Sequence, residues 1–132
     1  MSDNASGRDG LPTIIIIDDD DAVRDSLAIL LEAHGFDVRG FVSSEAYLAA
    51  PATRAFAVLA DHNLPGMSGL ELLQQLVAGA DPPRLGLISA RMNSAMRARA
   101  AALGAAAFDK PASTQGLLDW LGGSRRSADA GR

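Results

Sequence analysis

A run of five β-branched residues, Thr13 followed by four isoleucines at 14–17, constrains the fold of this chain more than any other feature. A strand with one wet face alternates apolar and polar side chains, whereas this run is apolar or β-branched at every position. Such a pattern is typical of a strand that is buried on both faces, as in parallel sheets covered by helices. The rest of the chain is therefore expected to supply further strands and the helices that cover them.

Short apolar runs and helical patterns do alternate along the chain. Four more strands are predicted, over residues 37–42, 56–60, 85–88 and 105–108. Helices are predicted over residues 22–33, from a Ser43 or Ser44 cap to Ala50, and over residues 68–77, 93–103 and 113–121. Five successive strand–helix units predict an α/β fold, a three-layer sandwich around a parallel sheet.

The length of 132 residues leaves room for one domain. We expect that domain to span residues 12–121, with residues 1–11 as a disordered N-terminal segment and residues 122–132 as a flexible C-terminal tail. No apolar run reaches the roughly 18 residues of a membrane span, and the polar first ten residues do not resemble a signal peptide. A cytoplasmic protein without membrane contact is expected.

Charge and cysteine content exclude other function classes. The formal net charge is −4, and Lys110 is the only lysine among twelve basic residues. A nucleic-acid binder usually carries a basic face, so direct binding to nucleic acid is not expected. Because the chain has no cysteine, disulfides, thiolate metal sites and cysteine nucleophiles are excluded.

Polar side chains follow four of the five predicted strands. Four aspartates at 18–21 follow the first strand, Asp61 the third, Ser89 the fourth and Lys110 the fifth. In parallel α/β folds, sites lie beyond the carboxyl ends of the strands, where the strand order reverses. We therefore expect these groups to converge in one pocket.

Each of these residues also has an ordinary structural interpretation. Asp20 or Asp21 could cap the following helix, Asp61 could bond its own turn, Ser89 could be a cap and Lys110 a solvated charge. Adjacent carboxylates repel, however, by about 1 kcal/mol at 4 Å in water and by several kcal/mol at lower dielectric. A hard divalent cation would relieve that repulsion, and oxygen-only ligands point to Mg²⁺ or Mn²⁺.

The strand-end residues together resemble the receiver domain of two-component response regulators, over roughly residues 13–121. The motifs that carry the resemblance are Asp18-Asp19, Asp61-His62-Asn63-Leu64-Pro65-Gly66-Met67-Ser68-Gly69, Ser89-Ala90 and Lys110-Pro111. Each is weak by itself, but the set in this order and at these spacings is specific. The resemblance implies a flavodoxin-like fold, with strand order 2-1-3-4-5 and about five helices.

The resemblance also implies a metal-dependent phospho-acceptor site. Asp61 would accept a phosphoryl group from a phosphohistidine or a small phosphodonor. Asp19 and Asp61 would bind Mg²⁺ directly, together with the main-chain carbonyl of Asn63. Asp18 would act mainly through a bound water.

The last two strands supply the groups that would contact the phosphoryl oxygens. By the resemblance, Lys110 neutralises their charge and Ser89 donates its hydroxyl, drawing its loop inward. The Lys110-Pro111 bond is expected to be cis. One position departs from the family: an aromatic usually stands where this chain has Ala107, and strand alternation directs the neighbouring Phe108 to the other face. The family pattern therefore does not predict how phosphorylation changes the signalling surface of this chain.

As a receiver domain, the chain would act in phosphorelay signal transduction and would not be an enzyme beyond its own phosphotransfer and dephosphorylation. The implied partners are a sensor histidine kinase or a histidine phosphotransfer protein, and a downstream protein target or missing effector domain. A phosphorylation-linked homodimer is possible. The cognate kinase and the output are not encoded in any motif.

Two alternatives to a phospho-accepting receiver domain remain. The Asp18-x-Asp20 pattern mimics the nucleophile motif of haloacid-dehalogenase-type phosphatases, although a cap insertion and a second acidic pair after the fourth strand are missing. The second alternative is a receiver-like interaction module with altered or absent phosphorylation switching, which Ala107 favours.

The chain has two histidines. His34 is expected to lie in the last turn of a helix, and His62 to project to solvent near the pocket mouth.

Overall fold

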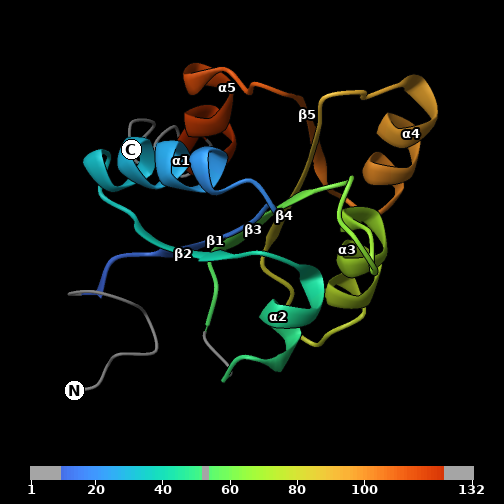
Figure 1. Cartoon of the computed structure of the whole chain (residues 1–132), viewed down its shortest axis with the longest axis horizontal. Coiled ribbons are helices and arrows are strands. Elements are labelled where there is room, and N and C mark those ends of the chain that lie inside the picture. The colour runs from blue at the N-terminus through green and yellow to red at the C-terminus, as the bar shows by residue number, and fades with distance from the viewer. Residues whose placement is uncertain (1–9, 52–53, 124–132) are drawn as a thin grey trace, which may run out of the picture.

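The computed structural model describes residues 10–51 and 54–123, and shows a parallel sheet with helices on both faces (Figure 1). Its strands are β1 (Thr13–Ile17), β2 (Asp37–Phe41), β3 (Ala57–Asp61), β4 (Arg84–Ser89) and β5 (Ala106–Asp109). All neighbouring strands are parallel, and their order is β2-β1-β3-β4-β5. The predicted fold class and strand order are confirmed. Most of the two predicted terminal segments, residues 1–9 and 124–132, lies outside the described residues.

Each helix follows a strand and begins at a side-chain cap. The helices are α1 (Asp21–Ala33), α2 (Ser44–Ala49), α3 (Gly69–Val77), α4 (Ser94–Ala102) and α5 (Thr114–Leu118), which continues into the π-helical turn η3 (Asp119–Gly123). The capping residues, each accepting a hydrogen bond from a main-chain N–H of the first turn, are Asp20, Ser43, Ser68, Asn93 and Ser113. Short polar side chains at these positions are the reason why the helix starts were predictable.

The isoleucine run divides between two cores, as expected for a strand buried on both faces. Ile15 and Ile17 pack with residues of α3 and α4, while Ile14 and Ile16 pack with residues of α1 and α5. All four isoleucines are at most 1% exposed. Helices α2, α3 and α4 therefore cover one face of the sheet, and α1 and α5 cover the other (Figure 1).

The last helical segment continues past residue 121, where the prediction ended it, through Gly122 and Gly123. The chain stays helical through Gly123 because tertiary contacts override the low helix propensity of glycine. Nη1 of Arg84 donates to the main-chain carbonyl of Trp120 at 2.7 Å, and Leu121 is fully buried. In the part of the chain described, no helix has the length and apolar character that a membrane crossing requires.

Candidate functional site

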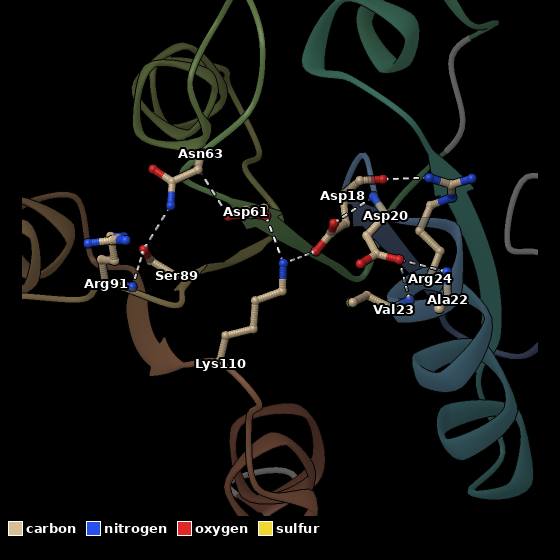
Figure 2. A network of polar contacts seen from close by, with 10 residues as sticks. All are labelled: Asp18, Asp20, Ala22, Val23, Arg24, Asp61, Asn63, Ser89, Arg91 and Lys110. Atoms are coloured by element: carbon tan, nitrogen blue, oxygen red, sulfur yellow. Dashed lines mark hydrogen bonds and ion pairs between the residues drawn. The ribbon is translucent and has the colours of Figure 1, made fainter.

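The predicted site residues meet at the carboxyl edge of the sheet, where β1, β3, β4 and β5 lie in succession (Figure 2). Asp18 follows β1, Asp61 ends β3, Ser89 ends β4 and Lys110 follows β5. The strand order reverses at β1, which pairs with β2 on one side and β3 on the other. The site therefore occupies the switch point at which parallel α/β sheets bind ligands.

Lys110 bridges the two buried carboxylates of the site. Its Nζ lies 2.8 Å from Oδ2 of Asp18 and 2.9 Å from Oδ2 of Asp61, and the two acids are 1% and 4% exposed. Burial by itself lowers the pKa of Lys110, but its hydrogen bonds to Asp18 and Asp61 and their negative charges outweigh burial and raise it. The site thus holds a permanent ammonium at neutral pH.

The acidic cluster has the composition of a divalent-cation site. Carboxylate oxygens of Asp18, Asp19 and Asp61 all lie within 4.8 Å of one another. Three carboxylates face the single ammonium of Lys110, so negative charge remains uncompensated. Hard cations such as Mg²⁺ prefer oxygen ligands of this kind, and the residues fit such an ion. Asp19 is exposed, which leaves the cluster open on one side.

The loop after Asp61 is held by one hydrogen bond to the Asp61 side chain and by close packing of Gly69 against the main chain. Oδ1 of Asp61 accepts a hydrogen bond from the N–H of Asn63 at 3.0 Å. Gly69, which opens α3, packs directly on this segment: a Cβ at that position would lie 2.3 Å from the carbonyl oxygen of Asp61. The glycine that ends the Asp61–Gly69 motif is therefore required by close packing of the main chain.

Ser89 connects the site to the loop before α4. Its side chain is fully buried, and its Oγ accepts a hydrogen bond from the N–H of Arg91 at 3.0 Å. Nδ2 of Asn63 lies 3.4 Å from the same oxygen. The prediction assigned only the main-chain carbonyl of Asn63 to the site, and the side-chain contact was not foreseen.

Comparison with known proteins identifies the family. The response regulator receiver domain matches residues 14–121. This chain belongs to that family. It is therefore a receiver domain, a phospho-acceptor module of two-component signalling.

Receiver-domain relatives of known role are longer proteins. The chain is 39% identical over 121 residues to the transcriptional regulatory protein FixJ of Azorhizobium caulinodans, covering 89% of this chain and 57% of the relative. It is 36% identical over 109 residues to the transcriptional regulatory protein TdiR of Thauera aromatica, covering 81% and 48%. The chain thus spans about half the length of the curated relatives it matches.

Solved structures agree with the fold. A receiver domain protein from Methanospirillum hungatei superposes with a TM-score of 0.79 at 25% identity, over 92% of this chain and 99% of that one. A response regulator protein from Burkholderia pseudomallei, with a phosphorylated aspartic acid and a calcium ion, superposes with a TM-score of 0.75 at 26% identity, over 90% and 72%.

The phosphatase alternative is not supported. In the Asp18-x-Asp20 pattern, Asp20 is exposed and its Oδ1 caps α1, accepting from the N–H of Ala22 at 2.9 Å. That contact gives Asp20 the capping role, and the receiver-domain match covers residues 14–121.

The receiver domain keeps the Lys110–Pro111 cis bond and the unusual Ala107. Ala107 packs against the core beneath α3 and α4, whereas Phe108 packs on the opposite side, edge-on to Trp120 with ring centroids 5.4 Å apart. The prediction that the two side chains point to opposite faces is confirmed. Phe108 therefore does not replace the missing aromatic.

The two histidines differ from each other. His34 is the C-terminal cap of α1, and its Nδ1 lies 2.9 Å from the carbonyl oxygen of Leu30, as a capping role requires. For His62 the predicted projection to solvent does not hold for the whole ring: the residue is partly buried, and its Nδ1 is buried without a hydrogen-bond partner among the described residues. Its main chain is tied down, because its N–H donates to the carbonyl of Ile88 at 2.9 Å and its carbonyl accepts from Gly69 at 3.3 Å.

Two polar contacts near the site had not been predicted. Nη1 of Arg24 donates to the main-chain carbonyl of Asp18 at 2.6 Å, and Oε2 of Glu45 accepts from the N–H of Met67 at 2.7 Å. Both join a helix side chain to a main-chain group in a neighbouring loop. Spacing in the sequence gives no signal for such contacts, apart from the three-residue separation of Asp21 and Arg24.

Proposed function

We propose that Asp61 is the phospho-acceptor of this receiver domain. An oxygen of Asp61 attacks the phosphorus of a phosphohistidine, the P–N bond breaks, and the imidazole leaves with the bonding electrons, giving an aspartyl phosphate. The observation that carries the proposal is that this buried carboxylate contacts the ammonium of Lys110 and lies in one cluster with the acids Asp18 and Asp19. The phosphorylated aspartic acid of the Burkholderia pseudomallei relative supports it.

We assign the cation site to the carboxylates of Asp18, Asp19 and Asp61 and the main-chain carbonyl of Asn63. Mg²⁺ is the proposed ion, and Mn²⁺ has the same ligand preference. When bound, the ion neutralises phosphoryl oxygens that would otherwise repel a carboxylate nucleophile. The Burkholderia pseudomallei relative holds a calcium ion in its structure, which supports a divalent cation for this chain.

Lys110 and Ser89 are proposed to stabilise the transferred group. Lys110 already lies 2.9 Å from the acceptor carboxylate, so its ammonium is placed to pair with a phosphoryl oxygen on Asp61. Ser89 retains a hydroxyl proton to donate, because its oxygen serves as the acceptor for Arg91 and Asn63.

The donor and the output follow from the family. We propose that a sensor histidine kinase or a histidine phosphotransfer protein supplies the phosphoryl group in the cytoplasm, and that a downstream protein or effector domain reads it. We also propose residues 12–121 as the unit that folds and is phosphorylated. The match to residues 14–121 supports these limits.

Intact mass after incubation with acetyl phosphate and Mg²⁺ tests the acceptor. The wild type should gain one phosphoryl group, and Asp61→Ala should gain none. Asp25→Ala, which removes an exposed acid of α1, is the matched control and should gain the group like the wild type. Absence of the gain in the wild type, or the same gain in Asp61→Ala, contradicts the proposal. Omitting Mg²⁺ or adding EDTA should abolish the gain.

A further inference from the structure

Arg24 lies at the end of the first turn of α1, and its side chain turns back to the end of β1. Nη1 donates to the main-chain carbonyl of Asp18 at 2.6 Å (Figure 2). Nη2 pairs with the carboxylate of Asp21. The side chain is only 21% exposed, although its helix lies at the surface. A guanidinium suits this position because its planar fork donates to two acceptors at once.

The carbonyl that Arg24 holds belongs to the peptide that joins Asp18 to Asp19. Because the peptide is planar, fixing this carbonyl also fixes the nitrogen from which Asp19 continues. The other polar groups of Asp18 are held as well: its N–H donates to the carbonyl of Phe41 at 3.1 Å, and its Oδ1 accepts from the N–H of Asp20 at 2.9 Å. Together with these hydrogen bonds, the bond from Arg24 orients both Asp18 and Asp19.

A second observation points to the same residue from another element. Gly40, in the edge strand β2, lies under the stem of Arg24, and a Cβ there would be 3.1 Å from Cδ and 3.6 Å from Nε of the arginine. Glycine inside a strand often marks the close approach of another group. The sheet thus leaves room for the path that this side chain takes to Asp18.

We propose that Arg24 is a positioning residue that holds the Asp18–Asp19 peptide in the orientation needed to bind the divalent cation. The proposal rests on the cation site proposed above. A guanidinium beside a cation site has two opposite effects. Its positive charge repels Mg²⁺, so removing it would tighten binding if charge were its only influence. If Arg24 orients the carboxylates, removing it weakens binding, and we expect the second result.

The Mg²⁺ dissociation constant, measured by calorimetry, distinguishes the two effects. Arg24→Met keeps much of the stem over Gly40 but removes the guanidinium, and Mg²⁺ binding should weaken about tenfold, as for other residues that orient metal ligands. Arg24→Lys keeps the positive charge but lacks the planar guanidinium, so its Mg²⁺ affinity should lie between those of the wild type and Arg24→Met. Arg99→Met removes the same charge from the exposed face of α4 and should leave Mg²⁺ binding unchanged. Unchanged or tighter binding in Arg24→Met overturns the proposal.

Amide hydrogen exchange in EDTA tests positioning without any metal. The N–H of Asp20 donates to Oδ1 of Asp18, so its exchange reports the orientation of that acid. Exchange should be faster in Arg24→Met than in the wild type and unchanged in Arg99→Met. An Asp20 amide that is protected equally in wild type and Arg24→Met contradicts the proposal, whatever happens at the cation site.

Gly40→Ala provides a variant that keeps Arg24. Its methyl group should displace the arginine stem and weaken Mg²⁺ binding in the same direction as Arg24→Met but less. In the Arg24→Met background the same substitution should have no further effect on Mg²⁺ affinity, since the contact is already lost. If Gly40→Ala weakens Mg²⁺ binding equally in the wild type and in Arg24→Met, the effect does not act through Arg24.

The proposal that Asp61 accepts the phosphoryl group and the proposal that Arg24 positions Asp18 and Asp19 can be refuted by different results. At saturating Mg²⁺, Arg24→Met should still gain the phosphoryl group on Asp61, because Asp61 and Lys110 are intact. A wild type without any phosphoryl gain refutes the acceptor. A wild type that gains it, with Mg²⁺ affinity and Asp20 exchange both independent of Arg24, refutes only the positioning role.

Discussion

Gly69 allows α3 to begin against the main chain of the strand that carries Asp61. A Cβ at this position would lie 2.3 Å from the carbonyl oxygen of Asp61, 2.8 Å from its carbonyl carbon and 3.1 Å from Cα of His62. All three neighbours are main-chain atoms, so they cannot move aside by a change of rotamer. An added methyl group must therefore shift either the helix or the acceptor.

Gly69→Ala is expected to impair both stability and phosphorylation. Overpacking should lower the free energy of unfolding by about 1–3 kcal/mol or more, and displacement of Asp61 should slow its reaction with acetyl phosphate. Urea unfolding and the time course of the mass gain measure the two effects. Gly104→Ala is the control: that glycine has φ +75° but no atom within 4 Å of an added Cβ, so only the conformational cost of about 1–2 kcal/mol remains. A normal phosphorylation rate in Gly69→Ala would contradict this account.

At the same scale, the sequence predicted residues that carry a motif and missed residues that act through main-chain atoms. Asp18, Asp61, Ser89 and Lys110 were found because they follow strands that the apolar runs reveal. The partner of a side chain such as Arg24 is a carbonyl, and every residue has one, so no pattern marks it. The partly buried ring of His62 was missed for a related reason, because the direction of a side chain after a strand depends on how the loop turns.

At the scale of elements, a single carboxylate joins α2 to the loop after Asp61. Oε2 of Glu45 accepts from the N–H of Met67 at 2.7 Å, across 22 residues of sequence. Gly66, with φ +76°, lies so close that a Cβ there would be 2.5 Å from the same oxygen. The hydrogen bond from Met67, followed by that from the main chain of Glu45 itself, lowers the pKa of Glu45 below its ordinary 4.5.

This contact predicts a pH-dependent difference between the wild type and Glu45→Gln. The pKa of Glu45 is lower in the folded protein, so its contribution to stability is present above pH 4.5 and is lost as the pH falls through the folded pKa. The melting temperature of the wild type should therefore exceed that of Glu45→Gln near neutral pH, and the difference should shrink on acidification. Thermal unfolding of both proteins from neutral to acidic pH measures it. A pH-independent difference, or an equal effect of Glu32→Gln on the exposed face of α1, would contradict the prediction.

Element boundaries were predictable to within about two residues where the signal is local. Caps such as Ser68, whose hydroxyl and the Glu71 carboxylate form a capping box, are written in adjacent residues. The end of the last helix was not predictable, because contacts with Arg84 and the burial of Leu121 hold it. The contact from Arg84 comes from a strand more than thirty residues earlier, whereas the two adjacent glycines predicted that the helix would end.

At the scale of the whole molecule, the core holds α4 much less firmly than α3, which covers the same face of the sheet. Of its nine residues only Ala100 is buried, whereas α3, of the same length, buries Gly69, Leu70, Leu72 and Leu73. Elements with few buried apolar contacts open more easily than the rest of a fold. The loop that leads into α4 is also tied to the site, because Oγ of Ser89 accepts from the N–H of Arg91.

These features predict that the response to phosphorylation occurs in α4 and its preceding loop. Met92 and Leu103 flank α4 and pack with Ala107 against the same core, so the small side chain at 107 offers no large group to reorient. If Ser89 moves toward the phosphoryl group, it carries the main chain of Arg91 with it. We therefore expect the change to be reported by the loop and α4, and much less by β5.

Hydrogen exchange before and after phosphorylation measures this response. In the unphosphorylated protein, amides of α4 should exchange faster than those of α3, and phosphorylation should change exchange over residues 90–103 more than over β5. Ser89→Ala should still be phosphorylated at Asp61 but should lose most of this change, since the hydroxyl that links the two is gone. Ser113→Ala, which removes a serine from the cap of α5, should keep it. A response concentrated in β5 and α5, or one that persists in full in Ser89→Ala, would show that the signal leaves the site by another route.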